Sequence, residues 1–289
     1  MPSELRNHSR FAHRLPAVYT LHSGSDLRTY GPVKRKTSHV MVGTRLALVL
    51  LMEVVALWPS LAGAADYHHV HLTAPNIEEA AQWYITHMGC QALSFRNDAC
   101  RFGATQVNFL AREPTGGSQG SGLDHFGISF PDLAAKMDEL EAAGIAVTMP
   151  LRDIPGLFKV GFVEDPWGTR IEVVEDPEYL GFHHVHLSSA DPDAALQWYQ
   201  EVFGGERRSL KGQLDGVLYG TVWLLATKAD GQVQPTTGRS FDHVGFSVSD
   251  LDAAATQMNR QGVEWLIEPS AATHPVTGQE MKYSLPCES

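Results

Sequence analysis

Histidines with a repeated spacing are the residues of this 289-residue chain that point most directly to chemistry. Four of them stand at equivalent places in short alternating stretches: His69, His125, His184 and His243. Because strand side chains alternate between faces, His69, His125 and a later Glu172 each lie opposite the apolar face of their strand. Two imidazoles and one carboxylate leave coordination positions open, a set typical of Fe(II), Mn(II), Ni(II) or Zn(II). The recurrence of the histidine favours a divalent-metal site over a structural role.

Two further histidines lie two residues beyond members of this group, His71 after His69 and His186 after His184. Residues i and i+2 of a strand share a face, so both imidazoles are expected beside the candidate ligands. His71 is therefore the predicted catalytic acid–base residue. A hydrogen-bonding side chain without a catalytic role is the alternative that the pattern leaves open.

The elements that must position these residues come from an internal repeat. Residues 68–72 recur at 183–187 with the same pattern of histidines. A second block, which begins at Asp124, recurs from Asp242. The register holds through the segments that follow, so the chain contains two duplicated halves.

Each half is itself double, because residues 69–77 and 125–133 have the same layout. Helices are expected to follow the N-cap residues Asn76, Asp132 and Asp191, whose side chains can accept hydrogen bonds from the first turn. Short β-rich stretches broken by turn residues follow each helix. The chain is therefore predicted to contain four βαβββ units.

With these units in place, the sequence resembles the vicinal oxygen chelate (VOC) superfamily, which includes glyoxalase I, extradiol dioxygenases and bleomycin-binding proteins. The shared motifs are an H-V-x-L strand, a capped helix ending in W/F-Y, a D-H-x-G-x-S strand and a D-P-x-G-x-x-I-E ending. The resemblance implies an α+β fold of two tandem VOC domains, residues 66–178 and 181–289. Each domain would pair two βαβββ units into a cupped mixed sheet around a divalent metal ion. The implied ligands are His69, His125 and Glu172 in the first domain and His184 and His243 in the second.

Two departures from the family leave the reaction open. Glyoxalase I-like members have a glutamate on the last strand of the first unit, whereas residues 106–110 contain no acid. Extradiol dioxygenases carry a tyrosine shortly before the D-P-x-G turn, where this chain has Phe158 and Phe162. The resemblance implies a metal-dependent lyase, isomerase or dioxygenase acting on a small molecule with adjacent oxygens, through a metal-bound enolate or catecholate. A non-catalytic small-molecule-binding module is the alternative.

An apolar run at residues 46–64 follows Arg45 and ends in small residues, as in a secretory signal peptide. Residues 41–65 are therefore predicted to be a signal peptide, and the mature protein to be periplasmic or secreted without a stable membrane span. An anchor formed by residues 46–64 is the alternative, although the charge of Glu53 disfavours it. Residues 1–40 lack apolar periodicity and are predicted to be a non-native upstream extension.

The remaining chain is acidic and contains few cysteines. Residues 65–289 hold 14 basic and 30 acidic side chains, a net charge of −16, which disfavours nucleic acid as a partner. A small-molecule substrate is the expected partner, and a homodimer stays open. In an exported protein Cys90 and Cys100 could pair or remain buried thiols, and the sequence does not decide between them.

The second domain is predicted to be incomplete. The residue that would match Glu172 falls beyond Ser289, so the second domain should lack its final strand. The expected consequences are an exposed sheet edge and at most two ligands in this domain.

Overall fold

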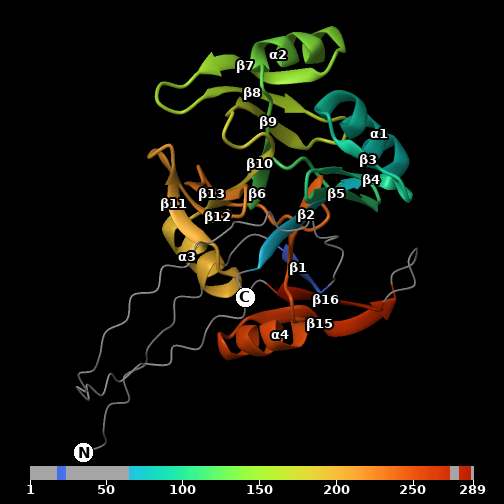
Figure 1. The fold of residues 1–289 in the computed structure, drawn as a ribbon, viewed down its shortest axis with the longest axis vertical. Coiled ribbons are helices and arrows are strands. Elements are labelled where there is room, and N and C mark those ends of the chain that lie inside the picture. Colours follow the sequence, from blue (N-terminus) through green and yellow to red (C-terminus); the bar gives the residue numbers. More distant parts are fainter. Residues whose placement is uncertain (1–17, 24–64, 274–279, 288–289) are drawn as a thin grey trace, which may run out of the picture.

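The structure is a computed structural model that describes residues 18–23, 65–273 and 280–287 (Figure 1). Three complete βαβββ units follow one another along the chain, which confirms the predicted repeat. The elements of these units are β2 (Asp66–Ala74), α1 (Ile77–Met88), β3 (Gln91–Leu93), β4 (Arg96–Phe102) and β5 (Thr105–Ala111); β6 (Leu123–Ser129), α2 (Leu133–Ala142), β7 (Ala146–Asp153), β8 (Lys159–Glu164) and β9 (Arg170–Glu175); and β10 (Gly181–Ser189), α3 (Pro192–Phe203), β11 (Glu206–Leu210), β12 (Leu214–Tyr219) and β13 (Val222–Lys228). The fourth unit contains β14 (Phe241–Ser247), α4 (Leu251–Arg260), β15 (Glu264–Thr273) and β16 (Glu280–Cys287), and β1 (Val18–Ser23) precedes all four.

The four helices begin at side-chain caps, as the sequence predicts for the first three. Asn76, Asp132, Asp191 and Asp250 each accept a hydrogen bond from the backbone N–H three residues further on, at 3.0 to 3.2 Å. Such a bond satisfies one of the N–H groups that the first turn of a helix leaves without a partner. The helices therefore start where the repeat places them, and every unit has the same strand-to-helix geometry.

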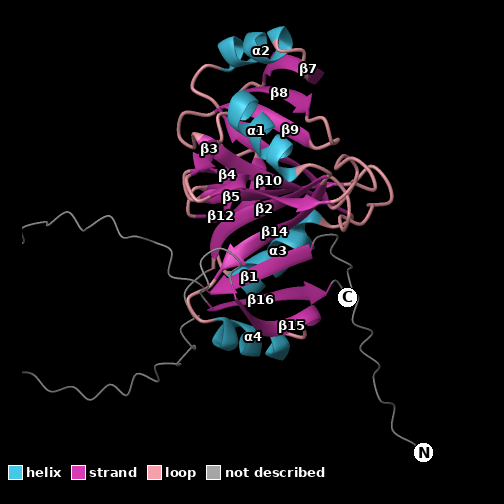
Figure 2. Ribbon diagram, turned by 90° about the vertical axis from the view of Figure 1, so that its right-hand side faces the viewer, coloured by secondary structure: helices cyan, strands magenta, loops and turns pink. Residues whose placement is uncertain are grey.

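The strands form two eight-stranded mixed sheets, and α2 and α4 lie at opposite ends of the long axis of the molecule (Figure 2). The first sheet has the order β15-β16-β1-β14-β2-β5-β4-β3, and the second has β11-β12-β13-β10-β6-β9-β8-β7. In both sheets the first strands of two units pair antiparallel at the centre, β2 with β14 and β6 with β10. The predicted α+β class with cupped mixed sheets is confirmed.

The units pair differently from the sequence-based expectation. The second unit shares a sheet with the third, and the first shares a sheet with the fourth, so each sheet draws on both halves of the chain. The repeat could not reveal this, because the alternation of the first strand allows the first unit to pair with either the second or the fourth. This pairing decides which functional side chains meet.

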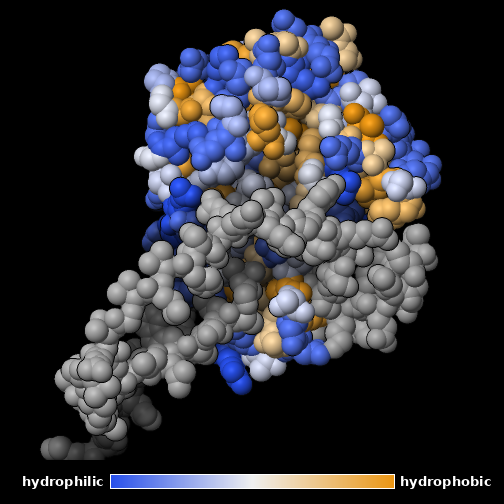
Figure 3. Space-filling view, viewed as in Figure 1, coloured by the Kyte–Doolittle hydropathy of each residue, from blue (hydrophilic) through white to orange (hydrophobic). Residues whose placement is uncertain are grey.

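A continuous apolar core joins the two sheets. Phe126 stacks on Phe182 of its own sheet at 5.4 Å between ring centroids and meets Phe241 of the other sheet edge-on at 5.7 Å. A hydrogen bond also joins the first and second units, because the hydroxyl of Tyr84 in α1 donates to a carboxylate oxygen of Asp165 at 2.7 Å. Figure 3 shows hydrophobic side chains gathered in the upper half of the visible face between hydrophilic ones. With the apolar strand faces in this core, the opposite faces are left to form the cups.

The edge of β14 is covered, contrary to the expected exposed edge. β1 pairs with β14 in parallel and with β16 antiparallel, as β9 pairs with β6 and β8 in the other sheet. Residues 18–23 thus take the position of the final strand that the fourth unit was predicted to lack. They belong to the segment predicted to lie outside the fold, which lacked the apolar periodicity used to recognise strands.

Cys90 and Cys100 are joined by a disulfide, which resolves the alternative that the sequence left open. The bond connects Cys90, two residues after the end of α1, to Cys100 in β4. The predicted signal peptide at residues 41–65 lies outside the described residues apart from Ala65. Among the described helices, none has the length and apolar character needed to cross a membrane.

Candidate metal centre

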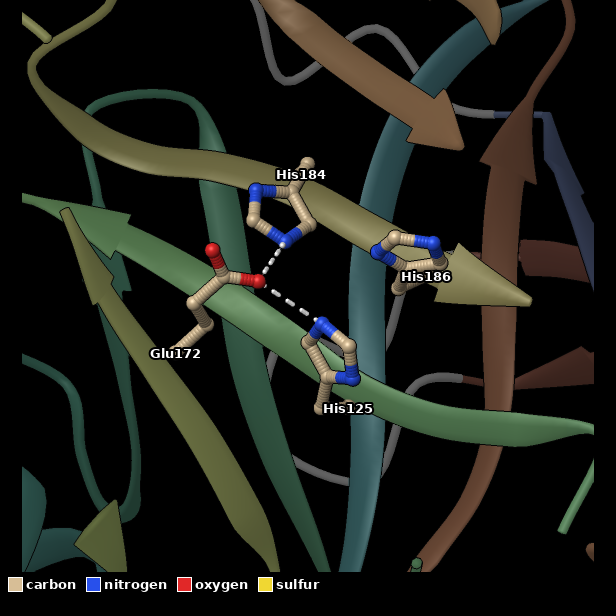
Figure 4. A group of neighbouring side chains, drawn as sticks. All are labelled: His125, Glu172, His184 and His186. Atoms are coloured by element: carbon tan, nitrogen blue, oxygen red, sulfur yellow. Dashed lines mark hydrogen bonds and ion pairs between the residues drawn. The ribbon is translucent and has the colours of Figure 1, made fainter. Parts of the chain in front are cut away.

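Four side chains converge in the second sheet on what we call the glutamate cluster: His125, Glu172, His184 and His186 (Figure 4). β6 carries His125, β9 carries Glu172, and the neighbouring β10 carries both other histidines. One potential ligand atom from each lies within 4.8 Å of all the others. The four residues are at most 9% exposed. Such a group of buried imidazoles and a carboxylate has the composition of a divalent-metal site.

The carboxylate of Glu172 is at the centre of the cluster. Its Oε2 lies 2.8 Å from Nε2 of His125 and 3.2 Å from Nε2 of His184. Burial by itself would raise the pKa of Glu172, but the two adjacent imidazoles outweigh burial and hold this pKa well below its usual range. The carboxylate is therefore ionised at neutral pH, the state that a metal ligand requires.

The imidazoles differ in their affinity for a proton. Burial lowers the pKa of His184 to about 4 and that of His186 well below its ordinary value. Burial also acts to lower the pKa of His125, but hydrogen bonds to Asp124 and Glu172 raise it overall. At neutral pH, His184 and His186 are neutral imidazoles, which can donate a lone pair to a metal ion.

Neighbouring polar residues behind the cluster orient two of its histidines. Asp124 accepts a hydrogen bond from Nδ1 of His125 at 2.7 Å, so Nε2 is the nitrogen directed at Glu172. Asp124 also accepts from Arg170 at 2.7 Å, which fixes the carboxylate. His183 lies 2.8 Å from Nδ1 of His184 through its own Nδ1. Second partners of this kind set the tautomer and ring orientation of metal-binding histidines.

Among the described residues, His186 has no hydrogen-bond partner that would compensate for its burial. Both of its ring nitrogens are buried and make no hydrogen bond to any described residue. Buried polar atoms are nearly always satisfied, so two such atoms on one ring indicate that a ligand belongs here. Together with the ionised carboxylate, this imidazole makes the cluster fit a divalent metal ion and a polar substrate.

Glycine makes room for this arrangement at Gly127 of β6. A Cβ atom at this position would lie 2.1 Å from Cε1 of His184, far inside van der Waals contact. Gly127 is also the register partner of Glu172 on the parallel strand β9. The glycine of the D-H-x-G motif therefore creates the space in which the ring of His184 approaches the glutamate.

Three other histidines form a second group, which we call the histidine cluster: His69, His71 and His243. β2 supplies the first two and β14 supplies the third. Nδ1 of His71 lies 2.7 Å from Nε2 of His243, and one nitrogen from each of the three lies within 4.8 Å of the others. The described residues place no carboxylate in this group.

The structure divides the predicted ligand set between these two clusters. His125 and Glu172 lie together, but the histidine that joins them is His184, which the sequence assigned to the second domain. His69 was expected beside Glu172 and instead lies with His243, because β2 pairs with β14 and not with β6. The predicted catalytic residue His71 also belongs to the histidine cluster, on the other sheet from Glu172.

Sequence reasoning did not assign roles to the residues that support the ligands. Asp124 precedes His125, and Asp242 precedes His243 in the same way; each accepts a hydrogen bond from the histidine next to it. The signal that could have found them was the repeated D-H dipeptide. His183 beside His184 belongs to a repeated H-H dipeptide and was likewise passed over.

The repeated units, the cupped sheets and the clustered histidines together define a member of one family. The sequence matches the Glyoxalase/Bleomycin resistance protein/Dioxygenase superfamily over residues 66–173 and 181–278, and the chain belongs to this superfamily. The resemblance recognised from the sequence motifs is therefore confirmed.

Individual relatives are distant. The chain is 26% identical over 158 residues to CFP32 of Mycobacterium tuberculosis, a match covering 50% of this chain and 59% of that protein. It is 34% identical over 91 residues to a protein of Arabidopsis thaliana named "Probable lactoylglutathione lyase, chloroplastic", covering 30% of this chain and 25% of that protein. The chain thus spans only about three fifths or less of the length of these curated relatives.

Among solved structures, glyoxalase I from Zea mays superposes with a TM-score of 0.59 at 15% sequence identity. The match covers 75% of this chain and 87% of the maize chain. At this identity the similarity establishes the shared fold, and the chemistry has to be argued from the site itself.

Proposed function

We propose that the chain is a metal-dependent VOC enzyme whose active site is the glutamate cluster. His125, Glu172 and His184 would hold one divalent ion, Fe(II), Mn(II), Ni(II) or Zn(II), as two imidazoles and one carboxylate. The observation that carries this proposal is the buried, ionised carboxylate between two oriented imidazoles. Without a cation or a substrate, the buried ring nitrogens of His186 would also lack partners.

The substrate proposed is a small molecule with two adjacent oxygens, such as a catechol or an α-hydroxycarbonyl. A bound divalent ion would act as a Lewis acid that makes such a substrate lose a proton more readily. His186 would accept that proton on a ring nitrogen, since its imidazole is neutral and faces the same cup as the ligands. This is the role that the sequence suggested for His71. The two residues are equivalent, because each lies two positions beyond the repeated histidine of its strand, His69 or His184.

The walls of the cup favour a substrate with apolar surface. Phe162 is the register partner of Glu172, Trp223 of His184 and Leu225 of His186, so their side chains share the face of the cluster. All three are buried members of one apolar group. These side chains exclude water from the cup, which strengthens the electrostatic effect of the charged residues there.

Metal content tests the first part of the proposal. The purified chain is expected to bind a divalent ion at this cluster, and Glu172→Gln should weaken that binding strongly. Glu164→Gln is the matched control, because it removes a carboxylate from the neighbouring strand β8 without touching the cluster. Equal metal affinity of Glu172→Gln and the wild-type protein would refute the proposal.

Substrate screening tests the second part. Protein loaded with each of the four metals would be assayed with catechols in an oxygen electrode and with 2-oxoaldehyde–thiol adducts by absorbance. Oxygen uptake identifies ring opening, and an absorbance change identifies isomerisation. No turnover in either assay, together with tight binding of a flat ligand, would favour the non-catalytic binding module.

We further propose that the protein is exported and matures near Ala65, which would remove β1 and leave the edge of β14 that it covers unpaired in the mature protein. The disulfide between Cys90 and Cys100 supports this compartment, since disulfides persist in oxidising environments. N-terminal sequencing of the protein recovered from cells is the test. A mature product that begins before residue 45 would contradict the proposal.

A further inference from the structure

The histidine cluster is built like the glutamate cluster, but it lies on the other sheet and has a different donor set. Its rings come from adjacent antiparallel strands, and Cβ at Gly245 would lie 2.0 Å from Cε1 of His69. The equivalent distance in the glutamate cluster is the 2.1 Å between Cβ at Gly127 and Cε1 of His184. In both places a glycine allows one imidazole to lie over the opposite strand.

The ring of His243 is held in a fixed orientation. Its Nδ1 donates to Oδ1 of Asp242 at 2.6 Å, which directs Nε2 toward His71. Asp242 is buried and accepts further hydrogen bonds from the backbone of Gly238 and from Arg112. This is the carboxylate–histidine arrangement that fixes the tautomer and ring orientation of metal-binding imidazoles.

The positions that could supply a carboxylate carry neutral residues. In the glutamate cluster the register partner of Gly127 is Glu172, but the register partner of the equivalent Gly245 is Thr20 of β1. On the other side of the cup, His71 is the register partner of Asn108, whose side chain therefore shares the face of the cluster. Asn108 is 7% exposed, and its carboxamide oxygen makes no hydrogen bond within the described residues.

We propose that the histidine cluster is a second metal site, in which His69, His71 and His243 bind a late divalent ion such as Zn(II). The Oδ1 atom of Asn108 would serve as a further neutral donor. Imidazole ligands favour Zn(II), Ni(II) and Cu(II), whereas Mn(II) is held best by sites that include carboxylates. The chain would then bind two zinc ions but only one manganese ion. This inference does not depend on the proposed catalytic function.

Metal stoichiometry of the full chain tests the inference. After equilibrium dialysis with Zn(II) or Mn(II), metal per chain would be measured by mass spectrometry. The wild-type protein is expected to bind two Zn(II) and one Mn(II). His71→Ala should lower zinc to one per chain and leave manganese unchanged. Glu172→Gln should abolish manganese binding but keep zinc, because three imidazoles and a carboxamide, the donor set proposed for the histidine cluster, then remain in the glutamate cluster.

The manganese site reports whether each variant is folded, because it lies on the other sheet. If His71→Ala loses both metals, Gly245→Ala provides a second route, since the added methyl group displaces His69 without deleting a ligand. It should lose one zinc and keep its manganese. A single zinc per wild-type chain, or two zinc ions retained by a variant that still binds manganese, would overturn the inference. Failure of the glutamate site would appear separately, as absent manganese binding in the wild-type protein.

Discussion

Replacing Gly127 by alanine is expected to weaken metal binding at the glutamate cluster without unfolding the protein. The added Cβ would lie 2.1 Å from Cε1 of His184, and carbon atoms pack comfortably only beyond about 3.4 Å. The ring must therefore retreat by about 1.3 Å. A metal–imidazole bond is about 2.0–2.1 Å long, so a ring displaced this far cannot coordinate together with Glu172. We expect metal affinity to fall by at least about 10–100-fold, the loss typical when a ligand is misoriented.

Competition with a chromophoric chelator measures this affinity directly, and thermal unfolding followed by circular dichroism reports the fold. The backbone at Gly127 does not have the positive φ that only glycine adopts readily, so strain of the main chain should not obscure the result. Gly161→Ala on β8 is the control, because its Cβ meets the flexible side chain of Met137 at 3.1 Å. Wild-type metal affinity in Gly127→Ala would show that His184 is not a ligand and would refute the reasoning.

Three further changes test other contacts of the fold and site. Burial raises the pKa of Asp165 from 3.8 to about 6, so its ionisation costs about 3 kcal/mol above that pH. The unfolding free energy of the wild-type protein should therefore fall as the pH rises from about 4 to about 6. Asp165→Asn, which can still form a hydrogen bond with Tyr84, should be more stable than the wild-type protein in urea unfolding at pH 7.5. A wild-type unfolding free energy that does not change over this pH range would contradict the prediction. Asp124→Asn should reduce metal affinity about 10–100-fold in the chelator assay by weakening the support of its histidine; unchanged affinity would argue against that role. Replacing Cys90 and Cys100 by serine should cost about 2–3 kcal/mol of unfolding free energy, since the bond closes a loop with a sequence separation of 10; denaturation midpoints equal to those of the wild-type protein would refute it.

Local structure could be predicted from the sequence because its causes are local. Asn76 and Asp132 cap their helices with bonds to residues three positions away, a relation visible in the sequence. The face of each strand follows from alternation alone, so the polar direction of His125 and Glu172 could also be read. These rules predict the βαβββ units and the residue types in the cups.

The composition of each cup could not be predicted, because it depends on pairing between units. His69 and His184 have the same strand context, so nothing near either residue indicates which of them meets Glu172. The contribution of β1 was also hidden. Its six residues pair through backbone groups with β14 and β16, and such pairing leaves no periodic pattern in so short a segment.

The steric fit between paired first strands nevertheless limits which units can share a sheet. Each unit carries one of the repeated histidines His69, His125, His184 and His243. Two residues after it stands either a further histidine, His71 or His186, or a glycine, Gly127 or Gly245. Cβ at Gly127 or Gly245 would collide with the repeated histidine of the opposite strand, His184 or His69, so a unit with a further histidine must pair with a glycine unit. Two glycine-containing and two histidine-containing units allow two such arrangements, and the structure adopts the one that joins the second unit to the third. Because Glu172 is the one carboxylate that the described residues place in either cluster, either arrangement produces one cup with a charged donor set and one with neutral donors. The difference between the two cups therefore follows from a single glutamate, and metal selectivity is the property in which that difference should be measured.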